Sequence, residues 1–379
     1  MKRILFLSHD NFLHGASRSM IDIASRFQQQ GCASVQVIIP GKGIIETVLE
    51  KEKIEYRSVW YPLMVHRKGT SVYKQIKKFL SAIKYLPRLR KQVQEFSPDL
   101  LYVNSVTNYW GLIVGKRLKI PTVLHIREFG ELDHGYYFDL HGLLFHRFKK
   151  IPALIICNSQ AVSDYFKKRF GVKSIVIPNA IYSRAQYDQH FQERARVREN
   201  HVDDQFTAIG IVGNIRVQKG QFDVVKAFHR ILERYPKSKL YLIGDGDTTQ
   251  IRKYIQENQL EKVIEITGFV TNVSDYYQQL DIVVMNSDFE AFGRTTIEAA
   301  SYGIPVVGKN GGGTPEIITH LETGILYSGQ IDELTDNLTK LIGDKGLRDR
   351  LGKKAWETAR EKFSLETHID AMRKVLIDQ

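Results

Sequence analysis

Two glutamates in the second half of the chain lie where they could bind a hydroxyl-rich, negatively charged ligand. Glu290 and Glu298 have seven residues between them, and the strand pattern that ends near Asn286 runs into the loop that carries Glu290. We expect a helix to start around Gly293, with Glu298 in its early turns. Carboxylates accept hydrogen bonds from hydroxyl groups, and the free amides of a helix start bind anions. The arrangement could hold a ribose and a hexose on either side of a phosphate; alternatively, Glu298 only stabilises the helix dipole and Glu290 is an ordinary loop acid.

A second group of candidate residues opens the same half of the chain. Residues 209–220 combine a strand pattern, a glycine turn and two spaced cations, Arg216 and Lys219, and a helical pattern follows. The cations could neutralise a pyrophosphate, helped by the positive end of the helix. No Walker loop is present, and two loop cations can equally be ordinary surface residues. The glycine-rich residues 308–317 could admit a ligand close to the backbone or could only link a strand to a helix.

The first half offers two further candidates. Gly15 precedes a helical pattern, so it either lets the backbone approach a ligand at a helix start or is a turn glycine. His125 ends a predicted strand, and parallel α/β sheets bind ligands beyond the carboxyl ends of their strands. No G-x-G-x-x-G motif favours a dinucleotide, and no set of His, Cys, Asp and Glu has the spacing of a zinc site.

Alternating strand and helix patterns position these residues. The strand patterns are continuous apolar runs, which indicate parallel sheets covered by helices on both faces. We predict strands at 4–7, 35–39, 100–103, 122–125, 153–157 and 174–177 in the first series, and at 207–212, 239–243, 263–266, 282–285 and 305–307 in the second. Helical patterns between them include residues 16–29, 161–170, 221–235, 248–258 and 294–302, and the chain is largely helical from 332 to 377.

These patterns predict an α/β fold of two doubly wound, Rossmann-like domains that face each other across a ligand cleft. The first domain is expected at residues 1–182 and the second at 206–363. A polar stretch at 183–205 is expected to link them, and a C-terminal helix at about 364–379 is expected to pack back on the first domain.

The positive charge of the chain is concentrated in its first half. The 379 residues carry a formal charge of +12, but residues 1–180 carry +15 and the remainder −3. Residues 67–91 hold nine basic residues and no acidic one. Apolar residues recur there at three- and four-residue steps, which predicts an amphipathic helix. Its apolar side is expected to pack on the domain core; its basic side is either only solvated or also rests on anionic lipid headgroups.

Several classes of protein are disfavoured by composition. Two cysteines, Cys32 and Cys157, cannot form a disulfide framework and suit a reducing compartment. No apolar run approaches the ~20 residues of a membrane span, and the apolar run after Met1 is too short for a signal peptide. We therefore expect a cytoplasmic protein that associates peripherally with the inner face of the cell membrane.

The order of these motifs resembles the retaining glycosyltransferases of family 4, which have the GT-B fold. The resemblance spans the chain and is carried most specifically by the paired glutamates Glu290 and Glu298, with Phe292-Gly293 and Glu298-Ala299 at the positions where the family usually has them. Further matches are residues 303–307, the run from Gly312 to Glu316, Ile177-Pro178-Asn179 and the strand turn at residues 243–246.

The resemblance implies a role for each candidate residue. Glu298 would bind the ribose of a nucleotide, Glu290 would contact donor-sugar hydroxyls, and Lys219 would bind the pyrophosphate. His125 would sit beside the reacting sugar carbon, so the implied catalytic residues are His125, Glu290 and Lys219. The implied donor-binding residues are Gly15, Asn214, Arg216, Lys219, Glu290, Phe292, Gly293, Arg294, Thr295 and Glu298. No metal and no cofactor is expected, since the cations and the helix end can neutralise the leaving group.

The sequence departs from the family pattern at three places. Asn214 stands where the family usually has an arginine, and Arg216 is close enough in sequence to supply the charge. The glycine pair of the first loop is His14-Gly15, and Asn104 stands where the family often has histidine.

The resemblance thus implies transfer of a sugar, with retention, from a UDP- or GDP-sugar to a glycan or lipid-linked acceptor. The basic first domain favours an acceptor at an anionic membrane surface, in bacterial surface polysaccharide or glycolipid synthesis. A nucleotide-sugar epimerase or a phosphorylase on the same fold is the alternative enzyme. A basic nucleic-acid-binding protein is the non-enzyme alternative, but that hypothesis leaves the paired glutamates unexplained, so we expect no nucleic-acid partner.

Overall fold

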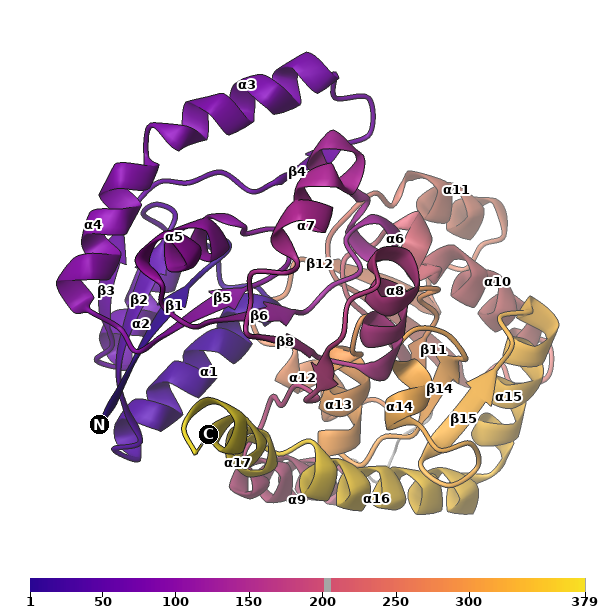
Figure 1. Ribbon diagram of the computed structural model, residues 1–379. Helices are drawn as coiled ribbons and strands as arrows, with labels where there is room; N and C mark the ends of the chain where they lie inside the picture. Colours follow the sequence, from indigo (N-terminus) through magenta and orange to yellow (C-terminus); the bar gives the residue numbers. More distant parts are fainter. Residues whose placement is uncertain (201–205, 379) are drawn as a thin grey trace. The chain divides into compact units, whose positions relative to one another are not determined.

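The computed structural model describes residues 1–200 and 206–378, which form two compact units. Unit 1 comprises Met1–Ala180 and Glu366–Gln379, and unit 2 comprises Ile181–Leu365. Each unit contains a parallel sheet with helices on both of its faces (Figure 1). The predicted α/β fold with two doubly wound sheets is therefore confirmed. Within the described ranges, no helix is both long and apolar enough to cross a bilayer.

The sheet of unit 1 has seven strands in the order β3-β2-β1-β5-β6-β8-β9, and all of its neighbours pair in parallel. The strands are β1 (Lys2–Leu7), β2 (Ala33–Ile39), β3 (Glu55–Ser58), β5 (Leu100–Asn104), β6 (Thr122–Ile126), β8 (Leu154–Cys157) and β9 (Ile175–Val176). A separate antiparallel pair joins β4 (Val65–Arg67) to β7 (Tyr136–Phe138). The sequence patterns missed β3 and β4, which are not apolar runs, and β7, which is a run of only three aromatic residues.

Helices cover both faces of the sheet of unit 1, and most of them bury apolar side chains. They are α1 (Gly15–Gln29), α2 (Ile45–Lys51), α3 (Val72–Ile83), α4 (Leu86–Phe96), α5 (Trp110–Leu118), α6 (Glu131–His134), η1 (Asp139–Gly142), α7 (Leu143–Phe148), α8 (Gln160–Phe170) and α17 (Leu365–Leu376). One core cluster joins α1 and α17 to the sheet through Phe27, Met372 and Phe6, all fully buried. On α5, Gly111 leaves no room for a Cβ beside Val103 of β5, so that helix lies close against the sheet.

The sheet of unit 2 has six parallel strands in the order β12-β11-β10-β13-β14-β15. They are β10 (Thr207–Val212), β11 (Ser238–Ile243), β12 (Ile264–Gly268), β13 (Ile282–Met285), β14 (Val306–Lys309) and β15 (Gly324–Tyr327). Its helices are α9 (Arg184–Asn200), η2 (Val217–Lys219), α10 (Gln221–Leu232), α11 (Thr249–Glu257), α12 (Ser274–Tyr277), α13 (Arg294–Ser301), α14 (Thr314–Ile317), α15 (Ile331–Gly343) and α16 (Lys345–Lys362). The strand β15 was not predicted.

Helix α9 occupies most of the predicted linker. Tyr187 on α9 is fully buried among unit 2 side chains, and Phe191, one turn later, stacks on Trp356 of α16. Because these two aromatic residues are four apart, they share the face that packs on unit 2. Residues 201–205 of the predicted linker lie outside the described residues.

The predicted basic helix at 67–91 is wrong in two respects. The segment forms two helices, α3 and α4, which are separated at Lys84-Tyr85, with Pro87 in the first turn of α4. Most of the apolar side of α3 also does not pack on the core: Val72, Ile76, Leu80 and Ile83 are all exposed, and only Phe79 stacks on the buried Trp110 of α5.

Polar contacts hold the opposite side of α3 instead. Lys78 Nζ lies 2.6 Å from the buried carboxylate of Asp139, and the Gln75 side chain accepts a hydrogen bond from the Leu140 backbone. These contacts orient the helix, and they leave its apolar side facing outward.

Candidate active site

Lys219 and Glu290 form an ion pair in unit 2, although 70 residues separate them in the sequence. Lys219 Nζ lies 2.5 Å from Glu290 Oε2, and both side chains keep part of their surface exposed. Lys219 ends η2, whereas Glu290 lies in the loop between β13 and α13. The parallel sheet brings them together because β10 and β13 are neighbours, so the loops that follow the two strands meet at one edge.

Buried side chains hold the two loops in this geometry. Asn286, just after β13, donates from Nδ2 to the Gly220 carbonyl over 2.8 Å and accepts from the Tyr327 hydroxyl. Gly220 has φ of 67°, and a Cβ there would lie 2.4 Å from Asn286 Nδ2. Gln221 donates to the Asn214 carbonyl over 3.0 Å. The position of Lys219 therefore depends on Asn286 and Gln221, which the sequence analysis did not single out.

The glycine-rich loop after β14 supports Glu290. The Gly313 N–H donates to the Glu290 carbonyl over 2.6 Å, and a Cβ at Gly312 would lie 2.4 Å from that same carbonyl oxygen. This loop thus packs on the backbone of the carboxylate, as residues without a side chain allow.

The start of α13 adds hydrogen-bond donors beside this pair. Gly293, with φ of 101°, precedes the helix and no side chain caps it, so the first amides of α13 are available to an anion. Arg294 Nη1 and Thr295 Oγ1 are buried, and neither has a hydrogen-bond partner within the described ranges. Phe292 contributes differently: its ring is in the core, against Phe363, so only its backbone can face a ligand.

Glu298 is oriented from two sides. Its Oε2 accepts a hydrogen bond from the Tyr277 hydroxyl over 3.1 Å, and its Oε1 lies 4.0 Å from an Arg294 nitrogen. Tyr277 is fully buried, and burial raises its pKa well above the ordinary value, so it remains a hydrogen-bond donor. Asn214 and Arg216 are exposed on the loop before Lys219.

Gly15 and His125 belong to unit 1. Gly15 is the first residue of α1. His125 lies at the buried end of β6, with no exposed surface, and its Nδ1 contacts the Tyr102 hydroxyl. Burial lowers the pKa of His125 well below its ordinary value, so the ring is neutral. His125 therefore contacts Tyr102 from a fully buried position in the sheet. Its role beside a reacting sugar carbon stays a prediction.

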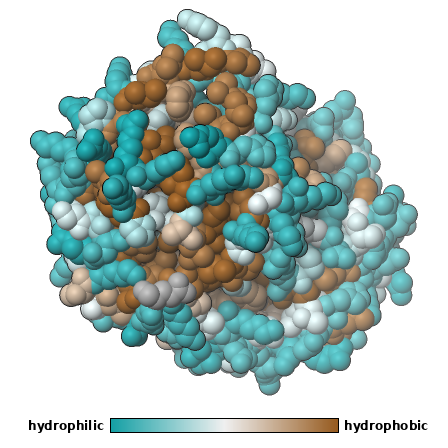
Figure 2. Space-filling view, viewed as in Figure 1, coloured by the Kyte–Doolittle hydropathy of each residue, from teal (hydrophilic) through white to brown (hydrophobic). Residues whose placement is uncertain are grey.

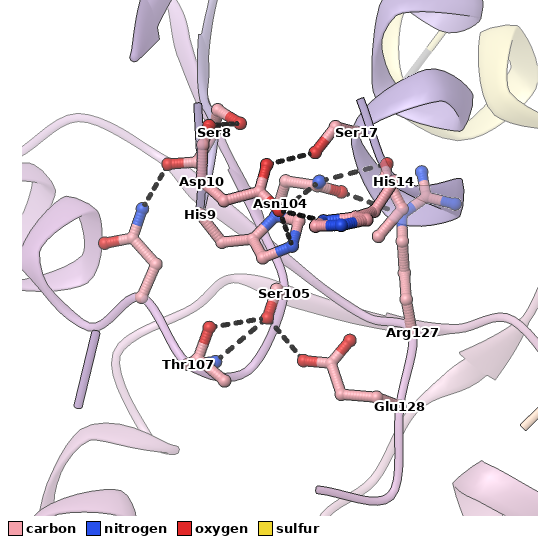
Figure 3. A network of polar contacts seen from close by, with 12 residues as sticks. Ser8, His9, Asp10, His14, Ser17, Asn104, Ser105, Thr107, Arg127 and Glu128 are labelled. Atoms are coloured by element: carbon pink, nitrogen blue, oxygen red, sulfur yellow. Dashed lines mark hydrogen bonds and ion pairs between the residues drawn. The ribbon is translucent and has the colours of Figure 1, made fainter. Parts of the chain in front are cut away.

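A polar network at the carboxyl ends of β1, β5 and β6 surrounds the first loop (Figure 3). Asp10 accepts hydrogen bonds from Ser17 over 2.5 Å and from His14 over 3.0 Å, and His9 lies 3.3 Å from it. Burial would raise the pKa of Asp10, but the His14 hydrogen bond and the neighbouring His9 outweigh burial and hold it below the ordinary value. Burial lowers the pKa of His9 to about 4.

Arg127 connects the deeper part of this network. Its Nε donates to Asn104 over 2.7 Å, and its two terminal nitrogens donate to Tyr102 and Asn179. Asn104 and Arg127 both stand at strand ends, so the rule that ligands bind beyond the carboxyl ends of strands could have found them from the sequence. The network offers donors and acceptors at the place where such a sheet binds a ligand.

Glu128 lies next to Arg127 and is almost fully buried. It accepts hydrogen bonds from the Ser105 hydroxyl and from the Val106 N–H, the latter over 3.0 Å. Burial raises the pKa of Glu128 from 4.5 to about 7. The folded protein therefore binds a proton there that the unfolded chain releases.

This proton makes stability depend on pH in a defined direction. Between pH 4.5 and about 7 the folded state holds more protons than the unfolded state at Glu128, so its contribution to stability falls as pH rises through that window. Glu128→Gln should remove the dependence, and the stability of the variant relative to wild type should rise by roughly 3 kcal/mol from pH 4.5 to pH 7.5. Urea unfolding at several pH values measures this difference; a difference that stays constant with pH would contradict it.

The predicted site residues therefore form two groups, one in each unit. In unit 2 the structure brings Lys219, Glu290, Arg294 and Glu298 to the loops around the start of α13. In unit 1, Gly15 lies beside the Asp10 network, and His125 contacts Tyr102, which Arg127 also contacts.

Both units match models of known protein families. The family model described as "Glycosyl transferases group 1" matches residues 192–358, and the one described as "Glycosyltransferase Family 4" matches residues 13–183. The chain is 25% identical over 269 residues to N-acetyl-alpha-D-glucosaminyl L-malate synthase of Bacillus anthracis, which covers 70% of this chain and 69% of that protein. It is 22% identical over 358 residues to alpha-monoglucosyldiacylglycerol synthase of Acholeplasma laidlawii, with 88% of each chain covered. The crystal structure of Anabaena HepE in complex with UDP and glucose matches with a TM-score of 0.81 and 21% identity over 100% of both chains.

Two parallel-sheet α/β domains of this kind define the GT-B fold. The chain belongs to the group 1 glycosyltransferases of family 4, whose two models together match most of its length. The predicted family and the predicted activity, a glycosyltransferase, are both confirmed.

Proposed function

We propose that this enzyme transfers a sugar, with retention of anomeric configuration and without a metal ion, from a UDP- or GDP-sugar to a glycan or lipid-linked acceptor. The observation that carries the proposal is the Lys219–Glu290 pair beside the start of α13. Departure of a nucleoside diphosphate develops negative charge, which Lys219, Arg216 and the first amides of the helix can stabilise in place of a metal. Glu290 and Glu298 supply the acceptor oxygens that sugar hydroxyls need.

The donor can be identified by thermal stabilisation, because a ligand that binds only the folded protein raises Tm by mass action. We expect one nucleotide sugar to raise the Tm of the wild-type enzyme. Glu298→Ala should lower the affinity for that nucleotide sugar by about tenfold or more, since the variant lacks a charged acceptor for hydrogen bonds from sugar hydroxyls. Glu322→Ala, which removes an exposed carboxylate from the turn before β15, is the matched control and should bind as wild type does. Binding of the donor to Glu298→Ala with unchanged affinity would contradict the assigned site.

The same experiment separates the reaction types once acceptor is supplied. Nuclear magnetic resonance of the product gives its anomeric configuration, and retention requires that it equal the configuration of the donor. Interconversion of the sugar without acceptor would instead show an epimerase.

The outward apolar side of α3 supports a lipid-linked acceptor. Figure 2 shows hydrophobic side chains gathered at the top of the view, over α3. Leu80 is 60% exposed and Ile76 42%, and the exposed lysines Lys74, Lys77 and Lys84 flank them. An apolar stripe bordered by cations suits the boundary between acyl chains and anionic headgroups. We therefore propose that α3 holds the enzyme peripherally at the cytoplasmic face of a bacterial membrane, where surface polysaccharide or glycolipid is made.

Substitution of the two apolar residues tests the role of α3. Ile76→Glu with Leu80→Glu should lower the fraction that co-sediments with anionic vesicles by about tenfold or more, because apolar burial in the interface is lost. Lys78 must be left intact, since it anchors the helix to Asp139. The control is Ile44→Glu with Ile175→Glu, two apolar residues of unit 1 that are also exposed. Equal loss in both variants would show that added charge alone, and not α3, causes the release.

A further inference from the structure

A cavity in unit 1 lies away from the polar network around Asp10 and Arg127. Its volume is about 400 Å³, which falls in the range of small-molecule sites. It is lined by the ends of α5 and α7 and by the segments that lead into β6 and β8. Thr122 begins β6 at this cavity, whereas Arg127 follows the other end of that strand, about 16 Å away for five residues of strand. The cavity is therefore at the amino-terminal edge of the sheet.

The cavity is strongly basic. Four of its lining residues are Lys116, Lys119, Arg147 and Lys150, and none of its lining residues is acidic. No ion pair in residues 1–200 and 206–378 involves any of the four cations. Four positive charges around one concave surface without a compensating carboxylate raise the local concentration of anions.

Stabilisation of helix ends does not account for this charge. The carboxyl ends of α5 and α7 lie at the cavity, and each carries a partial charge of about −0.5, so together they offset about one of the four cations. Lys119 also has φ of 57°, in the left-handed region where a helix end favours glycine. Lysine therefore occupies a backbone position at which glycine would be less strained.

The floor of the cavity is rigid and mostly uncharged. Gly115 has no room for a side chain, since a Cβ would lie 2.2 Å from Thr122 Oγ1. The segment from Ile120 to Thr122 is tied back to α5 through the Ile120 N–H, which donates to the Gly115 carbonyl over 2.9 Å. The cations therefore surround a floor that is already formed, and no part of the floor must fold before a ligand enters.

We propose that this cavity binds the phosphate groups of a diphosphate-bearing ligand, at a site separate from the sugar-nucleotide donor. Four cations are enough to neutralise the two phosphoryl groups of such a ligand, and lysine and arginine are the side chains that proteins use for phosphate. The site is lined by unit 1 residues alone, so it does not depend on the donor site in unit 2. The same chemistry is offered by a soluble diphosphate and by the headgroup of an anionic lipid.

The first test uses inorganic pyrophosphate and isothermal titration calorimetry, in a Lys219→Gln background that weakens the donor site. Changing Lys116, Lys119, Arg147 and Lys150 to Gln should weaken pyrophosphate binding by about tenfold or more, since four charged contacts are lost. The charge-matched control changes Lys51, Lys167, Lys168 and Lys173, all exposed in unit 1, to Gln. The control should bind pyrophosphate as the background does.

A second arm asks whether the ligand is a lipid. Vesicles of phosphatidylcholine with and without phosphatidic acid are sedimented with both quadruple variants. If the cavity variant, but not its control, loses binding to the phosphatidic acid vesicles, the ligand is a lipid headgroup. If the cavity variant loses only pyrophosphate binding and still binds the vesicles, the ligand is soluble. If the wild-type enzyme binds neither probe, or if the cavity variant and its control lose both probes equally, the proposal is wrong.

Lys119→Gly separates binding from folding. Glycine relieves the left-handed backbone, so the Tm of this variant should equal or exceed that of wild type. Its affinity for the probe that binds should nevertheless fall. Unchanged affinity in Lys119→Gly and in the quadruple variant would overturn the proposal.

Discussion

Lys219→Ala should lower kcat/KM by about 100-fold or more, which corresponds to roughly 3 kcal/mol of lost transition-state stabilisation. The reason is the charge that develops on the departing diphosphate. In the structure the Lys219 ammonium is held 2.5 Å from Glu290 by loops that Asn286 and Gln221 fix in place. A preorganised cation of this kind stabilises the transition state more than the ground state, so the loss should appear in kcat.

The measurement is steady-state kinetics with the donor identified by thermal stabilisation. Lys226→Ala is the matched control, because Lys226 lies on the next helix and pairs with the exposed Asp223 over 3.5 Å. Its kcat/KM should stay within about twofold of wild type, as for other surface ion pairs. Lys219→Arg should recover only part of the rate, because arginine keeps the charge but changes its shape. If the kcat/KM of Lys219→Ala equals that of the Lys226→Ala control, Lys219 does not stabilise the transition state.

Arg127→Ala should destabilise unit 1 by about 3 kcal/mol or more. The Arg127 guanidinium is 5% exposed and donates to Asn104, Tyr102 and Asn179. Its removal leaves these buried groups without a donor, and a buried polar group without a partner costs far more than its hydrogen bond contributes. Arg127→Lys should recover little, because one ammonium cannot reach partners in three directions.

Urea unfolding followed by tryptophan fluorescence measures this effect. In a Trp356→Phe background the remaining tryptophans, Trp60 and Trp110, both belong to unit 1, so the signal reports on that unit. Arg117→Ala removes an exposed arginine of α5 and should change the free energy of unfolding by no more than about 0.5 kcal/mol. A midpoint for Arg127→Ala equal to that of the Arg117→Ala control would show that the network does not stabilise the unit.

Most of the strands that contain a continuous apolar run of four or more residues were predictable, whereas the short or exposed strands and β15 were missed. β1, β5 and β6 are central strands that are buried over most of their length, and each contains an apolar run, as central parallel strands do. β3 lies at the sheet edge and is mostly exposed, so its sequence, Glu55–Ser58, has no such pattern. β4 and β7 pair only with each other, and their formation depends on a contact between segments about 70 residues apart.

The helix α3 shows why periodicity alone can mislead. Its apolar residues share one side, as the sequence predicted, but most of that side faces outward and only Phe79 packs on the domain. Periodicity tells which residues lie together on a helix, whereas the direction of that side depends on what anchors the other. Here the anchor is Asp139, which is 61 residues beyond Lys78 in the chain.

The sequence by itself determined the two-sheet α/β architecture, the family and the residue types of the donor site, because apolar runs and spaced glycines and carboxylates are local features. The tertiary structure decided which of these residues meet. Lys219 and Glu290 pair because β10 and β13 are neighbours in the sheet. Arg127 is buried because two separate segments surround it: β5, which carries Tyr102 and Asn104, and the segment after β9, which carries Asn179. Such contacts arise from strand order and packing, which no local pattern in the chain encodes.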